Sequence, residues 1–365
     1  MVSHVRLLIA ALILTSACGA NRSGTTTATA PGPGGAPTAA VPGTVESGAP
    51  AATPMPNRDG SLKFAILGDF GTGSQAQYDL AKQMANVRQR FEYEFVILVG
   101  DNIYGADRPQ DFKKKFEEPY KPLLDAGVKF YGALGNHDSR EQRYYKLFNM
   151  EGKFYYSFKA PKQDVRFIVL DSTYPEPEQI EWAAKELKGA AEAWKIAYFH
   201  HPLYSSGGRH GSDLRLRETL EPMFLNENVS VVFQGHDHFY ERLKPQKGIH
   251  YFVAGSGGQL RAGNIVDESN ISARGFDTDL VFMIAEIFED QLSFNAISRT
   301  GAVIDSGVIT RRAPATAKPT ADAPAAATVK PQAPPAKPPA AGTKPPGTAK
   351  PTAPEPARPT APATP

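Results

Sequence analysis

The sequence has 365 residues and a formal net charge of +2, with 40 Lys and Arg residues against 38 Asp and Glu residues. This near balance does not indicate a nucleic-acid partner, which would favour a strongly basic surface. Cys18 is the only cysteine, so an intramolecular disulfide, a cysteine-based metal site and a cysteine nucleophile in the folded domain are all excluded. Any bound metal must therefore be held by nitrogen and oxygen ligands.

Residues 1–20 are arranged like a secretory signal. An apolar run, Leu7 to Leu14, follows a basic residue and is too short to span a bilayer. The stretch that ends at Cys18, Leu-Thr-Ser-Ala-Cys, resembles the lipobox of bacterial lipoproteins, with Thr15 where leucine is commonest. We therefore expect export to the cell envelope and membrane attachment through a lipid anchor on Cys18. The alternative is an ordinary cleaved signal, which would give a periplasmic or secreted protein.

The composition is uneven along the rest of the chain. All 20 Phe, 14 Tyr and 2 Trp residues lie between Phe64 and Phe294, whereas 16 of the 32 prolines follow Arg312. We expect one folded domain over residues 61–312, a disordered linker over 21–60 and a disordered Pro/Ala/Lys-rich tail over 313–365. The two flanking segments carry too little apolar surface to offset the conformational entropy that ordering removes.

Within the predicted domain, buried strands alternate with amphipathic helices. Strands are predicted at residues 62–67, 94–99, 128–134, 165–170, 194–199, 229–234 and 250–254. Helices are predicted at residues 74–91, 111–125, 176–189 and 212–225, and an antiparallel meander at 280–288, 291–297 and 302–309. This alternation indicates a layered α/β fold.

Five of the buried strands stop at residues of the types that bind metal ions. The carboxyl edge of the strands is where α/β sheets bind ligands. Six of the eight histidines lie in these strand-end motifs or in the loop just after one of them. The candidate ligands are Asp69, Asp101, Tyr104, Asn136, His200, His236 and His238.

These candidate ligands suit Fe, Mn or Zn, because they offer only nitrogen and oxygen donors. Seven ligands would overfill one tetrahedral site, so two ions fit better than one. Asp101 lies in the middle of the set and is the expected bridge. Two adjacent ions can bind phosphoryl oxygens and activate a water molecule, so the expected reaction is the hydrolysis of phosphate esters.

Five motifs resemble, in order, the five blocks of the calcineurin-like metallophosphoesterases. They are Gly-Asp-Phe-Gly (68–71), Gly-Asp-Asn-Ile-Tyr (100–104), Gly-Asn-His-Asp (135–138), Ala-Tyr-Phe-His (197–200) and Gly-His-Asp-His (235–238). Tyr104 and Gly71 make the chain similar to the purple acid phosphatases in particular. The resemblance spans nearly all of the central domain and implies a four-layer α/β/β/α sandwich, in which two mixed sheets are flanked by helices.

The resemblance also assigns the candidate ligands to two ions. It implies that an Fe(III) ion is held by Asp69, Asp101, Tyr104 and His238. It implies that a second ion, Fe(II), Zn or Mn, is held by Asp101, Asn136, His200 and His236. The spacing His-x-Pro of the fourth block selects His200 as the ligand and leaves His201 at the rim of the site.

Three further residues match non-ligand positions of the family. The resemblance implies that His137 and His210 face the substrate, where they bind phosphate or protonate the leaving group. It implies that Asp138 orients His137. Ala197 departs from the family, which commonly has Val there, but this position is not a ligand.

On this basis we expect a phosphomonoesterase of the acid phosphatase type, which hydrolyses small phosphate esters with a hydroxide that the two metal ions activate. One alternative is a phosphodiesterase for nucleotides or phospholipid head groups, and another is an inactive surface-binding protein with the same fold. Tyr104 has a simpler interpretation as a packing residue beside two divalent ions, and His210 as a solvated loop residue. The glycine-rich stretch 255–258 either approaches the site with its backbone or forms a tight turn.

Overall fold

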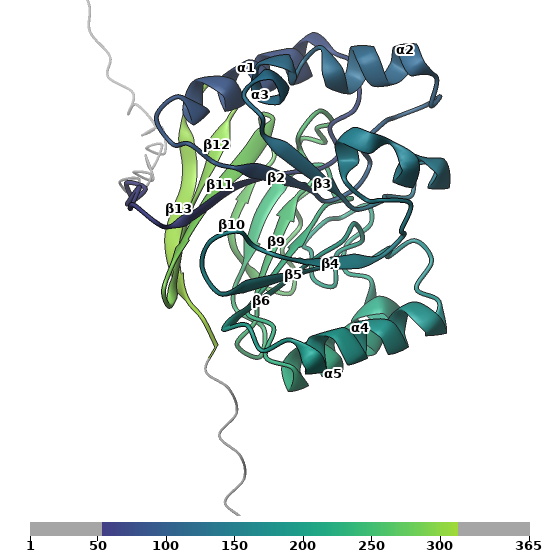
Figure 1. The fold of residues 1–365 in the computed structure, drawn as a ribbon, viewed down its shortest axis with the longest axis vertical. Helices are drawn as coiled ribbons and strands as arrows, with labels where there is room; N and C mark the ends of the chain where they lie inside the picture. The colour runs from purple at the N-terminus through teal and green to yellow at the C-terminus, as the bar shows by residue number, and fades with distance from the viewer. Residues whose placement is uncertain (1–52, 313–365) are drawn as a thin grey trace, which may run out of the picture. The chain divides into compact units, whose positions relative to one another are not determined.

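The computed structural model describes residues 53–312. Two β-sheets lie against each other in the middle of this domain, and helices cover the outer face of each sheet (Figure 1). The predicted four-layer α/β/β/α sandwich is therefore confirmed. The predicted export signal with Cys18, the tail over 313–365 and the linker up to residue 52 lie outside the described residues.

The first sheet has six strands in the order β13-β12-β11-β1-β2-β3. Its strands β1, β2 and β3 run parallel, whereas β11 pairs antiparallel with β1 and leads into the predicted meander of β11, β12 and β13. The bounds are β1 (Leu62–Leu67), β2 (Phe95–Leu98), β3 (Lys129–Gly132), β11 (Val281–Phe288), β12 (Gln291–Ser298) and β13 (Val303–Thr310).

The second sheet has seven strands in the order β10-β8-β9-β7-β6-β5-β4. Its parallel centre consists of β5 (Val165–Val169), β6 (Trp194–Tyr198), β7 (Val231–Gln234) and β9 (His250–Ala254). Its antiparallel strands are β4 (Tyr156–Lys159), β8 (Tyr240–Leu243) and β10 (Ser272–Phe276), none of which was predicted. Because β4 and β10 are short edge strands with polar residues, their sequences lack the apolar run of a buried strand.

Helices form the two outer layers of the sandwich. In Figure 1, α1 (Gln75–Arg88), α2 (Pro109–Phe112) and α3 (Lys121–Asp125) lie along one outer face, and α4 (Pro177–Gly189) and α5 (Leu214–Asn226) lie along the opposite one. The single helix predicted at 111–125 is wrong, because a π-helical turn (Lys113–Glu117) separates α2 from α3. Pro122 lacks the amide hydrogen that a continuous helix needs, so it begins a new helix instead.

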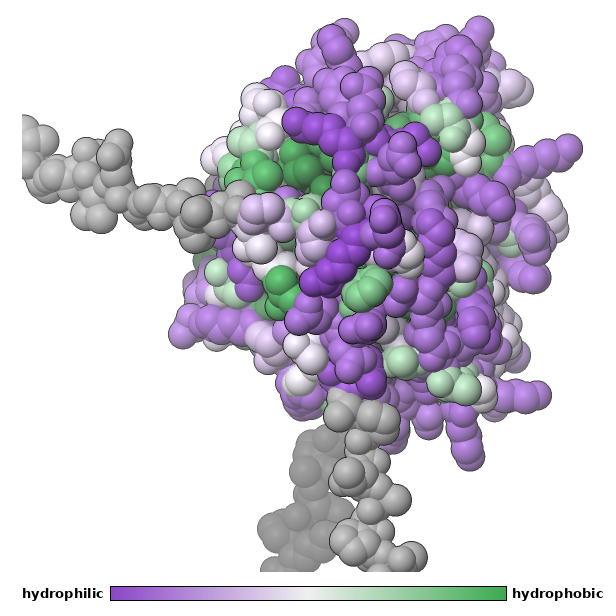
Figure 2. Space-filling model, turned by 60° about the vertical axis from the view of Figure 1, so that its left-hand side comes forward, coloured by the Kyte–Doolittle hydropathy of each residue, from purple (hydrophilic) through white to green (hydrophobic). Residues whose placement is uncertain are grey.

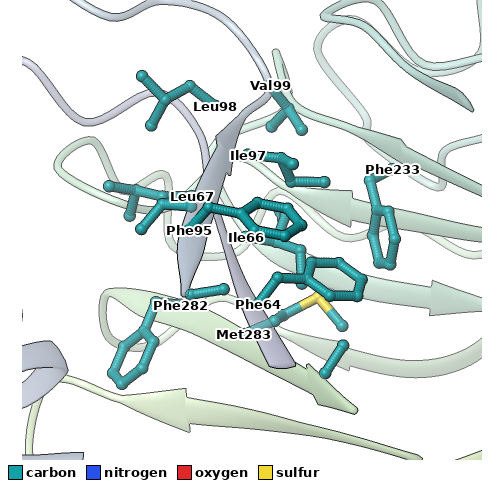
Figure 3. Close-up of a cluster of buried hydrophobic side chains, with 14 of the residues drawn as sticks. Phe64, Ile66, Leu67, Phe95, Ile97, Leu98, Val99, Phe233, Phe282 and Met283 are labelled. Carbon is teal, nitrogen blue, oxygen red and sulfur yellow. The ribbon is translucent and has the colours of Figure 1, made fainter. Parts of the chain in front are cut away.

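The core between the sheets is rich in aromatic rings. The ring of Phe64 on β1 stacks on Phe95 of β2 at 5.5 Å between centroids, and it meets the edges of Phe167 and Phe233 from the second sheet at 5.3 and 6.3 Å. Figure 3 shows Phe64, Phe95 and Phe233 together in this layer. Apolar burial between the two sheets therefore holds the strand ends of both sheets in a fixed relation.

The domain begins earlier than the predicted boundary at residue 61. The backbone N–H groups of Asn57 and Arg58 each donate a hydrogen bond of 2.6 Å to the carboxylate of Glu286 on β11. The side chain of Glu286 is buried, so its carboxylate needs such donors. Residues 53–60 are therefore part of the folded domain and not of the linker.

The surface on the side of β11, β12 and β13 is mainly hydrophilic (Figure 2). Hydrophobic areas on this face are separate patches with hydrophilic side chains between them. Over residues 53–312, none of the helices combines the length and the apolar composition that a membrane span requires.

Truncation of the core ring of Phe167 tests the packing between the sheets. We expect Phe167→Ala to lower the free energy of unfolding by about 3–5 kcal/mol, because it removes a fully buried ring and leaves a cavity. Urea titration followed by circular dichroism measures the change. The control is Tyr144→Ala, at a side chain that is 60% exposed, and equal losses in the two variants would contradict the assigned core.

Candidate metal centre

The centre lies where the parallel strands of both sheets end. Backbone hydrogen bonds join neighbouring strand ends within each sheet, from Asp69 N–H to Gly100 O and from Gly235 N–H to His200 O, both 2.9 Å long. Between the sheets, the N–H of His236 donates to Asp69 Oδ2 at 3.0 Å, and His200 Nδ1 lies 3.1 Å from Val99 O. These contacts bring the strand-end motifs into one cluster, as the sequence predicted.

Three of the predicted ligands have an unfavourable backbone conformation. The φ angles of Asp69, Asp101 and His236 are +54°, +51° and +70°, in the left-handed region that side chains with a Cβ rarely adopt. Such strain costs on the order of 1–3 kcal/mol at each residue and persists where the surrounding structure enforces it. The strain aims the three side chains into the cluster instead of along the strands.

Glycines allow the loops to pack closely behind these ligands. A Cβ atom on Gly135 would lie 2.2 Å from Asp101 Oδ1, and one on Gly235 would lie 2.4 Å from Asp69 Oδ2. Any larger residue at either position would displace a carboxylate. The glycines before Asn136 and His236 are therefore a steric requirement of the site.

The first group of donors comes from Asp69, Tyr104 and His238. The hydroxyl of Tyr104 lies 3.3 Å from both Asp69 Oδ1 and His238 Nε2, and these two atoms are 3.5 Å apart. Three donor atoms at nearly equal separations form a triangle that can face one metal ion. The hydroxyl of Tyr104 therefore lies among the other donor atoms of this group.

The second group of donors comes from Asn136, His200 and His236. His200 Nε2 lies 3.0 Å from Asn136 Oδ1 and 3.1 Å from His236 Nδ1. The same nitrogen is 3.4 Å from Asp101 Oδ1. These four side chains form a second cluster, which uses the amide oxygen and the imidazole nitrogens that the sequence predicted.

Asp101 takes part in both groups of donors. Besides its contact with His200, its side chain lies with those of Asp69 and His238 in one cluster whose ligand atoms are all within 4.8 Å of one another. Its Oδ2 atom is buried and has no hydrogen-bond partner among the described residues. An unsatisfied, buried carboxylate oxygen between two sets of donors is the arrangement expected of a bridging ligand.

The protonation states of the side chains in the two donor groups favour the binding of cations. Burial lowers the pKa of His200 well below its usual value, that of His236 to about 2 and that of His238 to about 4, so all three imidazoles are in the neutral, metal-binding form at pH 7. Burial raises the pKa values of Asp69 and Asp101, and it raises that of Tyr104, with the two carboxylates adding to the effect. Positive ions would relieve these raised pKa values, so the donor set fits two metal ions.

The structure gives Asp138 a different role from the predicted one. Its carboxylate accepts hydrogen bonds of 2.8 to 3.0 Å from the backbone N–H groups of Asn102, Ile103 and Gly135. Within residues 53–312, no hydrogen bond joins it to the ring of His137. Asp138 therefore braces the loops that carry Asp101 and Asn136, because those loops leave backbone donors that no strand satisfies.

Two exposed histidines lie beside the donor groups, and one of them is at the mouth of the centre. The N–H of His137 donates to Asp101 Oδ1 at 2.9 Å, and its ring lies 5.1 Å from that of Tyr104. The loop before α5 brings the ring of His210 to 4.3 Å from that of His236. The mouth is a depression of about 310 Å³ lined by His201, Pro202, Arg209, His210, Gly211, Ser212, Asp213 and His236.

Arg261 is a residue of the site that sequence reasoning missed. The loop after β9 crosses the first donor group, where Gln259 N–H donates to Asp69 O and Arg261 N–H donates to His238 O, both at 3.0 Å. Of the two alternatives for residues 255–258, the structure shows the backbone approach, because Gly257 N–H donates to Gly68 O. The Nη1 atom of Arg261 is buried without a hydrogen-bond partner in residues 53–312, and the charge of Arg261 is the second cause, after burial, of the lowered pKa of His238.

Replacing the carboxylate of Asp101 should abolish metal binding while the protein stays folded. We expect Asp101→Asn to keep or raise the Tm of the metal-free protein, because it removes a buried charge with no partner on Oδ2. Adding Mn²⁺ or Zn²⁺ should raise the Tm of the wild type and not that of Asp101→Asn, since a ligand at 100 times its Kd stabilises a fold by about 2.7 kcal/mol. Calorimetry with and without metal measures both effects.

The control for this experiment is Asp125→Asn, at an exposed carboxylate on α3 that pairs with Lys121. This variant should respond to metal as the wild type does. An equal metal-dependent rise in Tm for Asp101→Asn and the wild type would contradict the role of Asp101.

Comparisons with known proteins agree with this geometry. Residues 62–240 match the family model described as calcineurin-like phosphoesterase. Tartrate-resistant acid phosphatase type 5 of Rattus norvegicus is 26% identical over 250 residues, which cover 57% of this chain and 74% of that protein. Purple acid phosphatase 17 of Arabidopsis thaliana is 26% identical over 242 residues, which cover 57% of this chain and 71% of that protein.

Solved structures share the fold. Purple acid phosphatase PPD1 from seeds of yellow lupin (Lupinus luteus) superposes with a TM-score of 0.58 at 22% identity, over 71% of this chain and 55% of that one. GAP50, described as the anchor in the inner membrane complex of Plasmodium, also has a TM-score of 0.58 at 22% identity, over 69% of this chain and 90% of that one. The described domain is therefore a calcineurin-like metallophosphoesterase similar to the purple acid phosphatases, and thus a metal-dependent phosphoric ester hydrolase.

Proposed function

We propose that the protein is a phosphomonoesterase of the acid phosphatase type, with a dinuclear centre of Fe(III) and a divalent Fe, Zn or Mn ion. The observation that carries this proposal is the pair of donor groups that share Asp101, with two histidines at their open side. When bound, two such ions supply Lewis acidity at the phosphoryl group and lower the pKa of a bound water to about 7. The phenol of Tyr104, a hard oxygen donor, favours Fe(III) in the first donor group.

The residues of the chain itself would handle the substrate and the proton. His137 and His210 are exposed beside the donor groups, so their rings can contact phosphate oxygens and the ester oxygen that leaves as an alcohol. A protonated imidazole at this position can give its proton to the departing oxygen. The backbone N–H of His137 donates to Asp101 Oδ1, and this bond ties the position of the histidine loop to the shared ligand.

Two arginines favour a monoester over a diester. A phosphomonoester is largely a dianion at neutral pH, whereas a diester carries a single negative charge. Arg209 lines the mouth, and Arg261 affects the pKa of both His210 and His238. Guanidinium groups bind phosphate oxygens well, so they should bind the monoester dianion more tightly than the singly charged diester. The diesterase remains the second candidate, because the same donor groups serve either ester.

The proposal also includes export and a lipid anchor on Cys18, which rest on the sequence of residues 1–20 alone. The alternative of an inactive protein that uses this fold to bind a partner is disfavoured. The fold alone does not separate it from an enzyme, since GAP50 is described as an anchor. The full set of donors around Asp101, together with His137 and His210, supports an enzyme.

Activity on paired model substrates tests the proposed reaction. We expect the purified protein to contain two metal ions per chain, to be violet through the Tyr104 ligand, and to hydrolyse p-nitrophenyl phosphate with a higher kcat/KM than bis(p-nitrophenyl) phosphate. Metal analysis, a visible spectrum and steady-state kinetics give the three results. Preference for the diester would support the second candidate, and a metal-reconstituted protein without turnover of either ester would contradict the proposal.

Arg261→Gln tests the basis of the monoester preference. We expect the variant to lose about tenfold or more in kcat/KM for the monoester and clearly less for the diester, since a charge-assisted hydrogen bond contributes about 1.5–3 kcal/mol. The control is Lys82→Gln, which removes an exposed positive charge from α1. Equal losses for both esters, or none, would show that Arg261 does not select the dianion.

A further inference from the structure

His201 stands between the metal centre and a second depression. Ser172 holds it, because Ser172 Oγ accepts the backbone N–H of His201 at 2.9 Å and lies 3.0 Å from the ring atom Nδ1. On its other side, the ring of His201 lies 4.5 Å from that of His236. A side chain fixed in this way lies between the two regions.

The second depression has a volume of about 510 Å³, within the range of small-molecule sites. It is lined by Ser172, Thr173, Pro175, His201, Asp213, Arg215, Leu216 and Thr219. His201 and Asp213 also line the mouth of the metal centre, so the two depressions are neighbours. We call the second one the α5 groove, because the first turns of α5 form one of its walls.

The lining of the α5 groove is polar and close to neutral. Ser172, Thr173 and Thr219 bring hydroxyl groups, and Asp213 and Arg215 bring one charge of each sign. The carboxylate of Asp213 also caps α5 by accepting the N–H of Leu216 at 2.9 Å. The exposed side chain of Arg215 has no hydrogen bond or ion pair within residues 53–312, so its donors are free for a ligand.

We propose that the α5 groove is the subsite for the leaving group, and that it takes the hydroxyl-rich part of a sugar or polyol phosphate. Hydroxyl groups of a ligand can both donate to Asp213 and accept from Arg215, which a hydrocarbon group cannot do. The groove attracts a second phosphate group of a ligand only weakly, because the negative charge of Asp213 offsets the positive charge of Arg215. The inference rests on the proposed monoesterase function, which places the phosphate of the substrate at the metal centre.

Variants of the groove wall test this inference on the metal-loaded full-length protein. Thr219→Trp fills the groove from an exposed position of α5, and Arg215→Ala removes the free donors. We expect each variant to lose about tenfold in kcat/KM for glucose 6-phosphate, mainly through KM, because a site built for hydroxyl groups discriminates by its hydrogen bonds. Turnover of ethyl phosphate, whose short leaving group does not reach the groove, should stay within about twofold of the wild type.

The matched control is Lys185→Ala, which removes an exposed charge from α4, outside the groove. Equal losses for glucose 6-phosphate and ethyl phosphate in the groove variants, or no loss, would overturn the inference. A wild type that hydrolyses p-nitrophenyl phosphate but prefers ethyl phosphate to glucose 6-phosphate would also overturn it and leave the proposed function intact. A wild type that hydrolyses no ester would overturn both.

Discussion

The structure depends on the burial of two carboxylates, Asp69 and Asp101, at the point where the two sheets meet. Removing such charges from water is unfavourable unless nearby groups or ions compensate for it. The fold supplies the N–H of His236 to Asp69 and the N–H of His137 to Asp101, but it leaves Asp101 Oδ2 without a partner. The surrounding histidines are neutral, so bound cations would supply the compensating charge.

The rest of the fold keeps these carboxylates in place. Aromatic packing around Phe64 fixes the two sheets against each other, and hydrogen bonds between strand ends fix the loops. Strained backbone at Asp69, Asp101 and His236 then directs the side chains inward. The fold itself therefore holds the donor groups close together. Such preorganisation reduces the conformational cost of metal binding and of catalysis.

Much of this could be predicted from the sequence. The strand ends were visible because each buried strand is an apolar run that stops at a glycine and a polar residue, as at Gly100 and Asp101. These strand ends supplied the seven candidate ligands, and the order of the five motifs then predicted the layers of the sandwich. The ligands were predictable because parallel strands bring their carboxyl ends to one edge, so positions far apart in the sequence share one environment.

Other features depend on tertiary contacts that leave no local pattern. Arg261 lies in a loop with no repeat or motif, and only the path of that loop over Asp69 and His238 brings it to the site. The hydrogen bonds of Asp138 depend on where the loop of Asn102 runs, so its position beside His137 in the sequence was misleading. The packing of residues 53–60 on Glu286 joins segments more than 220 residues apart, a separation at which composition gives no signal.

The central claim is that two ions occupy the two donor groups and share Asp101. Anomalous diffraction from crystals of the metal-reconstituted protein, recorded at the absorption edges of the bound metals, tests it most directly. We predict two anomalous peaks, one facing Asp69, Tyr104 and His238 and the other facing Asn136, His200 and His236, with the carboxylate of Asp101 between them. A single peak, or two peaks of which neither contacts Asp101, would contradict the account.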